Sequence, residues 1–254
     1  MGLLDGKNAL VYGVANHRSI AWGITQALQR EGARIALAYV DRMERQVRDL
    51  AASLRDPLLV TCDVTDDAQI EAVYKQIGEA FGRLDTVVHS VAFAERQDLE
   101  GRFLDTSRDG FRTALEVSAY SLVAVARGAA PLMSGGGSIL SMTYDGSRRA
   151  YPSYNVMGVA KAALEAATRY LAADLGPDNI RVNAISAGPI STLSARGISG
   201  FTTMLKAAQE RAPLRRTPTT DEIGDAAVFL ASDLSRGITG ETLYVDSGLN
   251  IMGV

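Results

Sequence analysis

The sequence predicts an α/β fold, in which a single doubly wound domain has helices on both faces of a parallel, seven-stranded sheet. Seven short apolar runs lack polar alternation, which is typical of strands that are covered on both faces. Helical segments separate these runs from residue 8 to residue 185, with no linker, repeat or low-complexity tract between them. We therefore expect one domain over residues 1–254.

The alternation starts with two strands and two helices. NALVYG (8–13) is a short apolar run that ends in glycine, and ARIALAYV (33–40) is a second buried strand. Between them, residues 20–31 carry apolar side chains at helical spacing, and Gly32 is the expected stop of that helix. MERQVRDLAASL (43–54) is expected to form the next helix.

Three more strands follow, with helices between them. PLLVTCDV (57–64) is the third strand, and the helix DDAQIEAVYKQIGEAF (66–81) leads to the fourth, LDTVVHSVA (84–92). A long helical stretch over 108–130 precedes the fifth strand, GSILSM (137–142). Helical crossovers of this kind join parallel strands.

The last part of the chain breaks the alternation. A long helix over 153–175 leads to the sixth strand, NIRVNAISAG (179–188), and ETLYVDSG (241–248) is the seventh. The stretch 189–220 between these two strands departs from the pattern. By position it overhangs the carboxyl ends of the strands, where ligands bind in open α/β sheets.

We interpret residues 191–212 as a substrate-covering flap. Gly197 and Gly200 lie within it, and a short helix is expected around 203–210. The alternative is a structural insertion without a covering role.

The composition argues against several functional classes. The net charge of −3 gives no indication of nucleic-acid binding, and no apolar run reaches transmembrane length. The N-terminus lacks a signal-peptide core, and the lone Cys62 excludes an internal disulfide and fits a reducing compartment. Two histidines and one cysteine also argue against a metal site. We expect a cytoplasmic enzyme or binding protein that engages neither nucleic acid nor membrane.

The first strand–turn–helix unit favours a dinucleotide site of the Rossmann type. Gly13 ends the strand, and Ser19 and Ile20 open the helix, whose N-terminus offers free N–H groups and partial positive charge to a pyrophosphate. The turn GVANHRSIAWG is not a G-x-G-x-x-G motif, however. The alternative is that Ser19 is only an N-cap, but the place of this turn at the start of a doubly wound pattern favours the cofactor interpretation.

Two further strand ends carry residues that suit a ligand. Asp63 can accept a hydrogen bond from an adenine amino group while Val64 packs on the ring; the alternative is a helix-capping carboxylate. In HSVAFA (89–94), Ser90 and Ala92 are small enough for the backbone to approach a ligand, or else they permit tight helix–strand packing.

The end of the second strand bears on the choice between NADH and NADPH. Val40, Asp41 and Arg42 stand there in succession. An acidic residue binds a ribose 2′-hydroxyl, whereas arginine accommodates a 2′-phosphate. We favour NADH and leave NADPH open.

Tyr154 and Lys161 are the expected catalytic pair. A helix turns about 100° and rises about 1.5 Å per residue, so positions seven apart lie about 20° from one line and nearly two turns apart. Both side chains therefore face one cleft without touching. Lys161 can donate to nicotinamide ribose hydroxyls, and Tyr154 can donate to a carbonyl oxygen that gains charge. Met157 occupies the place of the tyrosine in the common Tyr-x-x-x-Lys pair, and we expect it to pack in the core or the substrate wall.

Tyr144 is a third candidate. It follows the GSILSM strand at its carboxyl end, thirteen residues before Met157, where a serine accompanies the Tyr-x-x-x-Lys pair. The spacing by itself leaves open whether Tyr144 is catalytic or only caps the strand. Tyr151 is expected at the surface or in a lid, and Arg148 and Arg149 are interpreted as solvated loop charges.

Over essentially its whole length the chain resembles the bacterial NADH-type enoyl-(acyl carrier protein) reductases of the short-chain dehydrogenase/reductase superfamily. The Tyr-x6-Lys spacing with a second tyrosine ten residues upstream is highly specific. The other matching stretches are GVANHRSIAWGI, CDV, HSVAFA, SAYSLVAVARGAAPLM, YNVMGVAKAALEA, RVNAISAGPISTL and ITGETLYVDSGLNIMG.

The resemblance implies a role for each matching residue. Tyr154 would donate to the thioester carbonyl, Lys161 would bind the ribose, Tyr144 would be the second active-site tyrosine, and Ala94 would touch the acyl substrate. The residues implied to bind the cofactor, with Lys161, are Gly13, Ser19, Ile20, Asp63, Val64, Val91, Ile190, Ser191, Thr192, Leu193 and Ser194.

The function that the resemblance implies is NADH-dependent reduction of the trans-2 double bond of enoyl thioesters in type II fatty-acid synthesis, by a homotetramer. One alternative is a carbonyl reductase or alcohol dehydrogenase, against which Met157 and the Tyr-x6-Lys spacing argue. A second is a non-catalytic NAD(H)-binding sensor, against which the intact Tyr154 and Lys161 argue. Only the first function includes activity on crotonyl-CoA with NADH.

Two features depart from relatives. Val40 stands where similar proteins often carry a polar residue near the adenosine. Ser199, Thr202 and Thr203 stand where some relatives place basic residues that meet the acidic carrier protein. An enoyl-CoA could therefore serve as substrate as well as an enoyl-acyl carrier protein, unless other basic residues compensate: Lys206, Arg211, Arg215 and Arg216.

Overall fold

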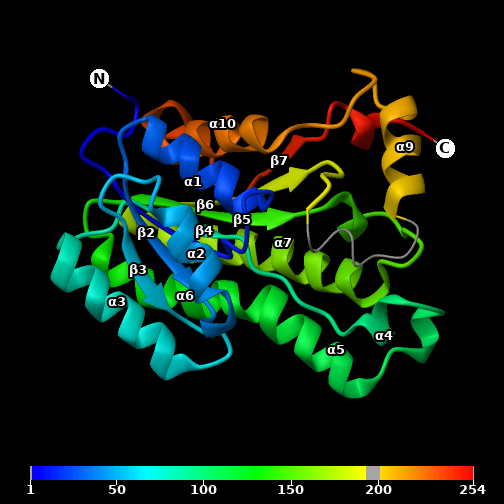
Figure 1. The fold of residues 1–254 in the computed structure, drawn as a ribbon, viewed down its shortest axis with the longest axis horizontal. Coiled ribbons are helices and arrows are strands. Elements are labelled where there is room, and N and C mark those ends of the chain that lie inside the picture. Colours follow the sequence, from blue (N-terminus) through cyan, green and yellow to red (C-terminus); the bar gives the residue numbers. More distant parts are fainter. Residues whose placement is uncertain (1, 193–200, 254) are drawn as a thin grey trace.

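A seven-stranded parallel sheet forms the centre of the molecule, with strand order β3-β2-β1-β4-β5-β6-β7 (Figure 1). The computed structural model describes residues 2–192 and 201–253. It confirms all seven expected strands, with narrower bounds for all except β5, which is one residue longer: β1 Asn8–Tyr12, β2 Arg34–Tyr39, β3 Leu58–Thr61, β4 Thr86–His89, β5 Gly137–Thr143, β6 Ile180–Ala187 and β7 Thr242–Val245.

The strand order reverses direction between β1 and β4. From β1 the chain builds outward to β3, then returns to β4 beside β1 and builds outward to β7 on the other side. Ligands of open α/β sheets bind at the carboxyl ends of strands at such a reversal point. The topology therefore places the residues after β1 and β4 at the centre of the expected site.

Helices cover both faces of the sheet, as predicted. Along β1, Leu10 and Tyr12 join a core that includes α3 (Asp67–Phe81), α6 (Ser121–Ala129) and α7 (Asn155–Leu175). Ala9 and Val11 point the other way, because side chains alternate along a strand. They join the second core, which includes α1 (Ile20–Arg30), α2 (Glu44–Ala51) and α10 (Thr220–Ala231).

Helix α10 was not predicted from the sequence. A capping box opens it, in which the Thr219 hydroxyl accepts from the Glu222 N–H and the Glu222 carboxylate accepts from the Thr219 N–H. Ile223 and Ala227 are fully buried against α1 and the sheet. The helix was not predicted because its N-cap and first residue belong to the stretch 189–220, which departs from the alternation of strands and helices.

Two other helical details differ from expectation. The stretch predicted as one helix over 108–130 consists of α5 (Arg108–Leu115), a π-helical segment (Glu116–Tyr120) and α6. A short helix, α4 (Arg96–Leu99), lies in the loop after β4, where none was predicted. π segments interrupt α-helices most often next to functional sites.

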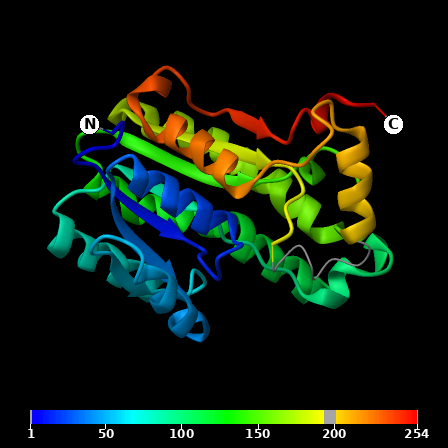
Figure 2. The same cartoon turned by 45° about the horizontal axis from the view of Figure 1, so that its top comes forward.

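The carboxyl ends of the strands point toward the end of the molecule where α9 (Phe201–Arg211) stands, with the C-terminal residues close by (Figures 1 and 2). The expected helix around 203–210 is therefore present and slightly longer. Among the described residues, no helix is both long enough and apolar enough to cross a membrane.

Candidate active site

The backbone segments that follow β1 and β4 approach each other very closely. Gly13 has a φ of +95°, and a Cβ atom placed on it would lie 2.1 Å from the carbonyl oxygen of Ser90. Only glycine fits at this position, because any side chain would clash with backbone that cannot move aside. The approach leaves a surface at the reversal point where Gly13 presents backbone without a side chain.

Ser19 caps α1 next to this surface. Its hydroxyl accepts from the Trp22 N–H at 3.3 Å and donates to the Asn16 carbonyl oxygen at 2.7 Å. The interpretation of Ser19 as an N-cap is thus correct. It is compatible with a pyrophosphate site at the same helix N-terminus. The capped helix begins at Ile20 and carries partial positive charge at that end.

At the end of β3, Asp63 and Val64 lie in different environments. Asp63 is exposed, and its Oδ1 accepts from the N–H and the hydroxyl of Thr65 at 3.0 and 2.8 Å. The N-cap of α3 is Asp66, so the capping alternative for Asp63 is wrong. Val64 is buried in the core beneath α3.

After β2, the two charged residues that bear on the choice between NADH and NADPH lie at the surface. Val40 is half-buried, whereas Asp41 and Arg42 are exposed in a short 3-10 turn, Asp41–Met43.

The loop after β4 is held by the π segment. The Ser118 hydroxyl accepts from the Phe93 N–H at 3.0 Å and donates to the Phe93 carbonyl oxygen at 3.1 Å. Val91 packs against the core at the start of this loop, and Ala94 packs with Tyr154 against a small apolar cluster. The loop therefore brings Ala94, for which the resemblance implies contact with the substrate, to the same apolar cluster as the expected catalytic tyrosine.

Tyr154 lies at the start of α7 rather than within it. The helix was expected over 153–175 but begins at Asn155, with Tyr154 as its N-cap residue in a helical conformation. Burial, followed by the charge of Glu165, raises the pKa of Tyr154 well above its ordinary value. The phenol is therefore protonated and a hydrogen-bond donor at neutral pH.

The structure brings three tyrosines together. The ring of Tyr144 meets that of Tyr154 edge-on, with centroids 5.2 Å apart, and lies 5.2 Å from the ring of Tyr151. The Tyr151 hydroxyl donates to Asp145 Oδ2 at 2.9 Å, and burial with this bond raises its pKa to about 12. Tyr151 is thus half-buried, as part of the tyrosine cluster, and its expected place at the surface or in a lid stays a prediction.

Lys161 lies in α7, beside the end of β5. Its side chain is buried, and its Nζ donates to the Met142 carbonyl oxygen at 2.8 Å. Burial lowers the pKa of Lys161 to about 8, while the nearby charge of Glu165 opposes that effect. Met157, four residues earlier, is buried in the apolar cluster beside Tyr154, as predicted.

Sequence analysis missed two buried polar residues near Lys161. His89, at the end of β4, has its Nε2 2.7 Å from the Ser121 hydroxyl, and no described residue bonds its Nδ1. Burial, and then the charge of Lys161, lower the pKa of His89 to about 3, so the ring is neutral. Glu165 is the second. Its place four residues after Lys161 was the available signal.

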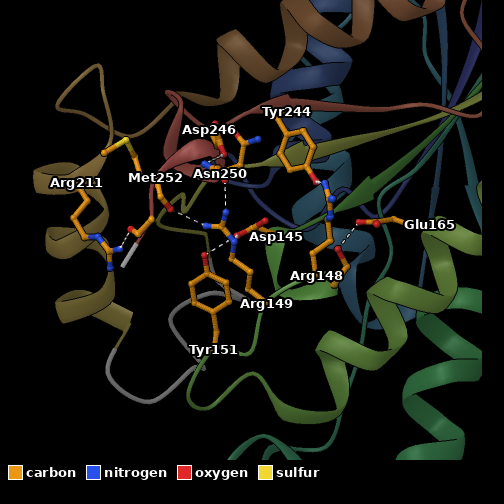
Figure 3. Close-up of polar contacts among 12 residues, drawn as sticks. Asp145, Arg148, Arg149, Tyr151, Glu165, Arg211, Tyr244, Asp246, Asn250 and Met252 are labelled. Carbon is orange, nitrogen blue, oxygen red and sulfur yellow. Dashed lines mark hydrogen bonds and ion pairs between the residues drawn. The ribbon is translucent and has the colours of Figure 1, made fainter.

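Arg148 and Arg149 are exposed loop charges, as interpreted, and both also make hydrogen bonds to other parts of the chain. Arg148 donates to the Tyr244 hydroxyl at 3.0 Å, and Arg149 donates to the carbonyl oxygens of Asn250 and Met252 (Figure 3). These bonds fix the C-terminal segment against the loop that carries the tyrosines.

A cavity of about 210 Å³ opens beside the tyrosine cluster. Its wall includes Tyr144, Tyr151, Met204, Ala207, Leu249 and Met252. The Tyr144 hydroxyl lies 3.9 Å from the Met204 sulfur, so α9 stands directly over this tyrosine. Arg149 and Arg211 also line the cavity. A wall that combines apolar side chains with hydroxyl and guanidinium groups suits an acyl chain that ends in a polar head.

The segment after β6 is described only in part. Ile190, Ser191 and Thr192 lie there, and the Thr192 N–H donates to the Ile190 carbonyl oxygen at 2.7 Å. The expected cofactor residues Leu193 and Ser194, with Ser199 of the expected flap, lie outside the described residues.

Three of the four basic residues considered for carrier binding make contacts with other residues of the protein itself. Arg211 donates to the Gly253 carbonyl oxygen, Arg215 donates to that of Glu210, and Arg216 pairs with Glu222. Lys206 is exposed on α9, as are Thr202 and Thr203. Among the described residues, no group of three or more His, Cys, Asp or Glu side chains gathers to hold a metal.

Comparisons with known proteins agree on one family. A family model described as enoyl-(acyl carrier protein) reductase matches residues 13–250. The NADH-dependent enoyl-(acyl carrier protein) reductase FabI of Bacillus subtilis is 55% identical over 98% of this chain and 97% of its own length. The corresponding protein of Aquifex aeolicus is 47% identical over 100% of this chain and 95% of its own.

Two solved structures show the same fold. The enoyl-acyl carrier protein reductase of Bacillus cereus, crystallised with NADP+ and an indole naphthyridinone, superimposes with a TM-score of 0.98 at 54% identity, covering 100% of both chains. The reductase of Anaplasma phagocytophilum, in complex with NAD, gives a TM-score of 0.96 at 48% identity, covering 100% of this chain and 97% of its own.

Proposed function

Because the chain belongs to the enoyl-(acyl carrier protein) reductase family of the short-chain dehydrogenase/reductase superfamily, we propose that Tyr154, Tyr144 and Lys161 carry out its reaction. The protein is an NADH-dependent oxidoreductase that reduces the trans-2 double bond of enoyl thioesters in type II fatty-acid synthesis. The observation that supports these roles is the edge-on contact of Tyr144 and Tyr154 near the buried Lys161, all beside the end of β5.

The residues at the strand ends fit a dinucleotide. The backbone surface at Gly13, the capped N-terminus of α1 and the exposed carboxylate of Asp63 suit a pyrophosphate and an adenine amino group. We assign to NADH the residues Gly13, Ser19, Ile20, Val40, Asp63, Val64, Val91, Lys161, Ile190, Ser191, Thr192, Leu193 and Ser194.

In the proposed reaction, NADH supplies the hydride, and the side chains of the protein stabilise charge and bind the ligands. Bound NADH supplies the hydride that adds to the β-carbon of the enoyl thioester. Negative charge then moves to the thioester oxygen, where the Tyr154 hydroxyl donates a hydrogen bond that strengthens as the enolate forms. Tyr144 shapes the site beside it, Ala94 contacts the acyl group, and the Lys161 ammonium binds the ribose hydroxyls. The α-carbon takes its proton from solvent afterwards.

Crotonyl-CoA with NADH tests this function. We expect the purified protein to oxidise NADH only when the enoyl thioester is present, and to act on enoyl-CoAs of increasing length. A ketone substrate serves as the control. Turnover of the ketone without turnover of crotonyl-CoA would favour a carbonyl reductase, and NADH binding without any turnover would favour a sensor.

We further propose that residues 191–212 form a flap over the substrate. The contact between Met204 and Tyr144, and the place of Ala207 in the wall of the cavity, support a covering role for α9. We propose an enoyl-acyl carrier protein or an enoyl-CoA as substrate and a cytoplasmic location, which the lone thiol of Cys62 suits. The whole chain then works as one domain.

A homotetramer is the proposed assembly. Large apolar side chains are exposed on α5, the π segment and α7, where Phe111, Tyr120, Val159 and Tyr170 are 37 to 76% accessible. Exposed apolar patches of this kind mark protein–protein interfaces.

Light scattering should therefore give the mass of four chains of 27.0 kDa each. Tyr170→Asp is expected to lower that mass, because it places a charge in the buried contact. Leu234→Asp, at an exposed apolar residue away from these helices, is the matched control and should keep the mass. A wild-type monomer would contradict the proposal.

A further inference from the structure

Glu165 holds the turn that carries Tyr144. This side chain is buried on α7, and a single carboxylate oxygen, Oε1, accepts from the Thr143 hydroxyl at 2.7 Å and the Ser147 hydroxyl at 2.6 Å (Figure 3 shows Glu165 reaching toward this turn). Thr143 ends β5, and Ser147 ends the short 3-10 turn Asp145–Ser147. The two bonds therefore bracket Tyr144 on both sides.

Helix α7 holds this segment at a third point, one turn earlier. Lys161 Nζ bonds the Met142 carbonyl oxygen, which is two residues before Tyr144. The turn also lies directly on the helix, since a Cβ atom on Gly158 would be 2.7 Å from the Gly146 carbonyl oxygen. Lys161 and Glu165 thus fix the backbone around Tyr144 from adjacent turns of one helix.

The charges that face Lys161 come from several elements. Glu165 stabilises its ammonium from the same helix. His89 from β4 is neutral, so it adds no opposing charge. Arg148 and Asp145, from the turn, interact with each other, and Arg148 also interacts with Glu165. Glu165 is therefore the anion whose charge favours the protonated form of the buried Lys161.

We propose that Glu165 is a positioning residue for the reduction, which sets the place of Tyr144 and sustains the charged form of Lys161. The inference rests on the roles proposed for these two residues. A buried carboxylate that only stabilised the fold would need its hydrogen bonds but not its charge. Mutations can remove the charge of Glu165 or its hydrogen bonds separately. A role in the reaction can therefore be distinguished from a role in stabilising the fold alone.

Glu165→Gln removes the charge and keeps an oxygen that can accept hydrogen bonds from the Thr143 and Ser147 hydroxyl groups. An opposite charge nearby raises the pKa of an ammonium, so its loss lowers that pKa. Lys161 then loses its proton at lower pH. We expect the alkaline fall in kcat, and the alkaline weakening of NADH binding measured by fluorescence, to move down by about 1 pH unit or more.

The reverse change is the double variant Thr143→Val with Ser147→Ala, which keeps the charge and removes the bonds. We expect kcat to fall about tenfold, because Tyr144 is displaced, with the alkaline midpoint unchanged. Asp174→Asn, an exposed carboxylate on the same helix, is the matched control and should change neither quantity.

An unchanged alkaline midpoint for both kcat and NADH affinity in Glu165→Gln would overturn the inference. Should that variant not fold, Glu165→Asp takes its place: a reduced kcat with the wild-type midpoint supports the inference, and a wild-type kcat overturns it. The NADH titration also separates the two proposals. Wild-type protein that binds NADH but reduces no enoyl thioester would contradict the proposed function, while the effect of Glu165 on NADH affinity stays measurable.

Discussion

Tyr154→Phe is expected to lower kcat for crotonyl-CoA by about 100-fold or more, the usual cost of removing one donor to a developing oxyanion. The hydroxyl is lost while the ring remains, so the edge-on contact with Tyr144 and the packing against Met157 should persist. Folding stability should therefore change little. The effect should appear in kcat rather than in the KM for NADH, because the lost bond forms mainly in the transition state.

Steady-state kinetics with thermal melting provide the measurement for this variant. Tyr170→Phe is the matched control, since Tyr170 lies on the same helix outside the tyrosine cluster and phenylalanine keeps its apolar ring in the proposed interface. If Tyr154→Phe kept wild-type turnover, the assignment would be wrong and Tyr144 would become the leading donor. Tyr144→Phe would then be the variant that loses activity.

Lys161→Met is expected to weaken NADH binding about 10- to 100-fold, the range for losing a hydrogen bond from a charged group. Methionine retains most of the aliphatic stem, which limits the cavity left in the buried site. The pH dependence supplies a second signature. Because the pKa of Lys161 is about 8, wild-type NADH affinity should be complete below that pH and fall as pH rises through it. The variant should lack this alkaline fall.

Fluorescence titration with NADH at several pH values measures both effects. Lys75→Met is the control, because Lys75 is exposed on α3, away from the strand ends. Unchanged NADH affinity in Lys161→Met would show that the ammonium does not bind the cofactor.

The secondary structure was largely predictable, because burial on both faces leaves a direct mark on the composition of a parallel strand. All seven strands show this composition, and the helices α1, α2, α3 and α7 show apolar side chains at helical spacing. Helix α10 was missed although its capping box is visible as Thr219 and Glu222 in the sequence. The π segment was missed too, and the bonds of its Ser118 to the loop after β4 are tertiary contacts that no local pattern shows.

The sequence by itself determined that Lys161 lies on a helix and that Tyr154 stands seven residues before it, next to the start of that helix. Only the tertiary structure decided what surrounds them. It packs Tyr144 and Tyr151 against Tyr154 and supplies Glu165 with its two hydroxyl partners. Such contacts join residues by distance in space, and burial then sets their protonation, which no local pattern encodes.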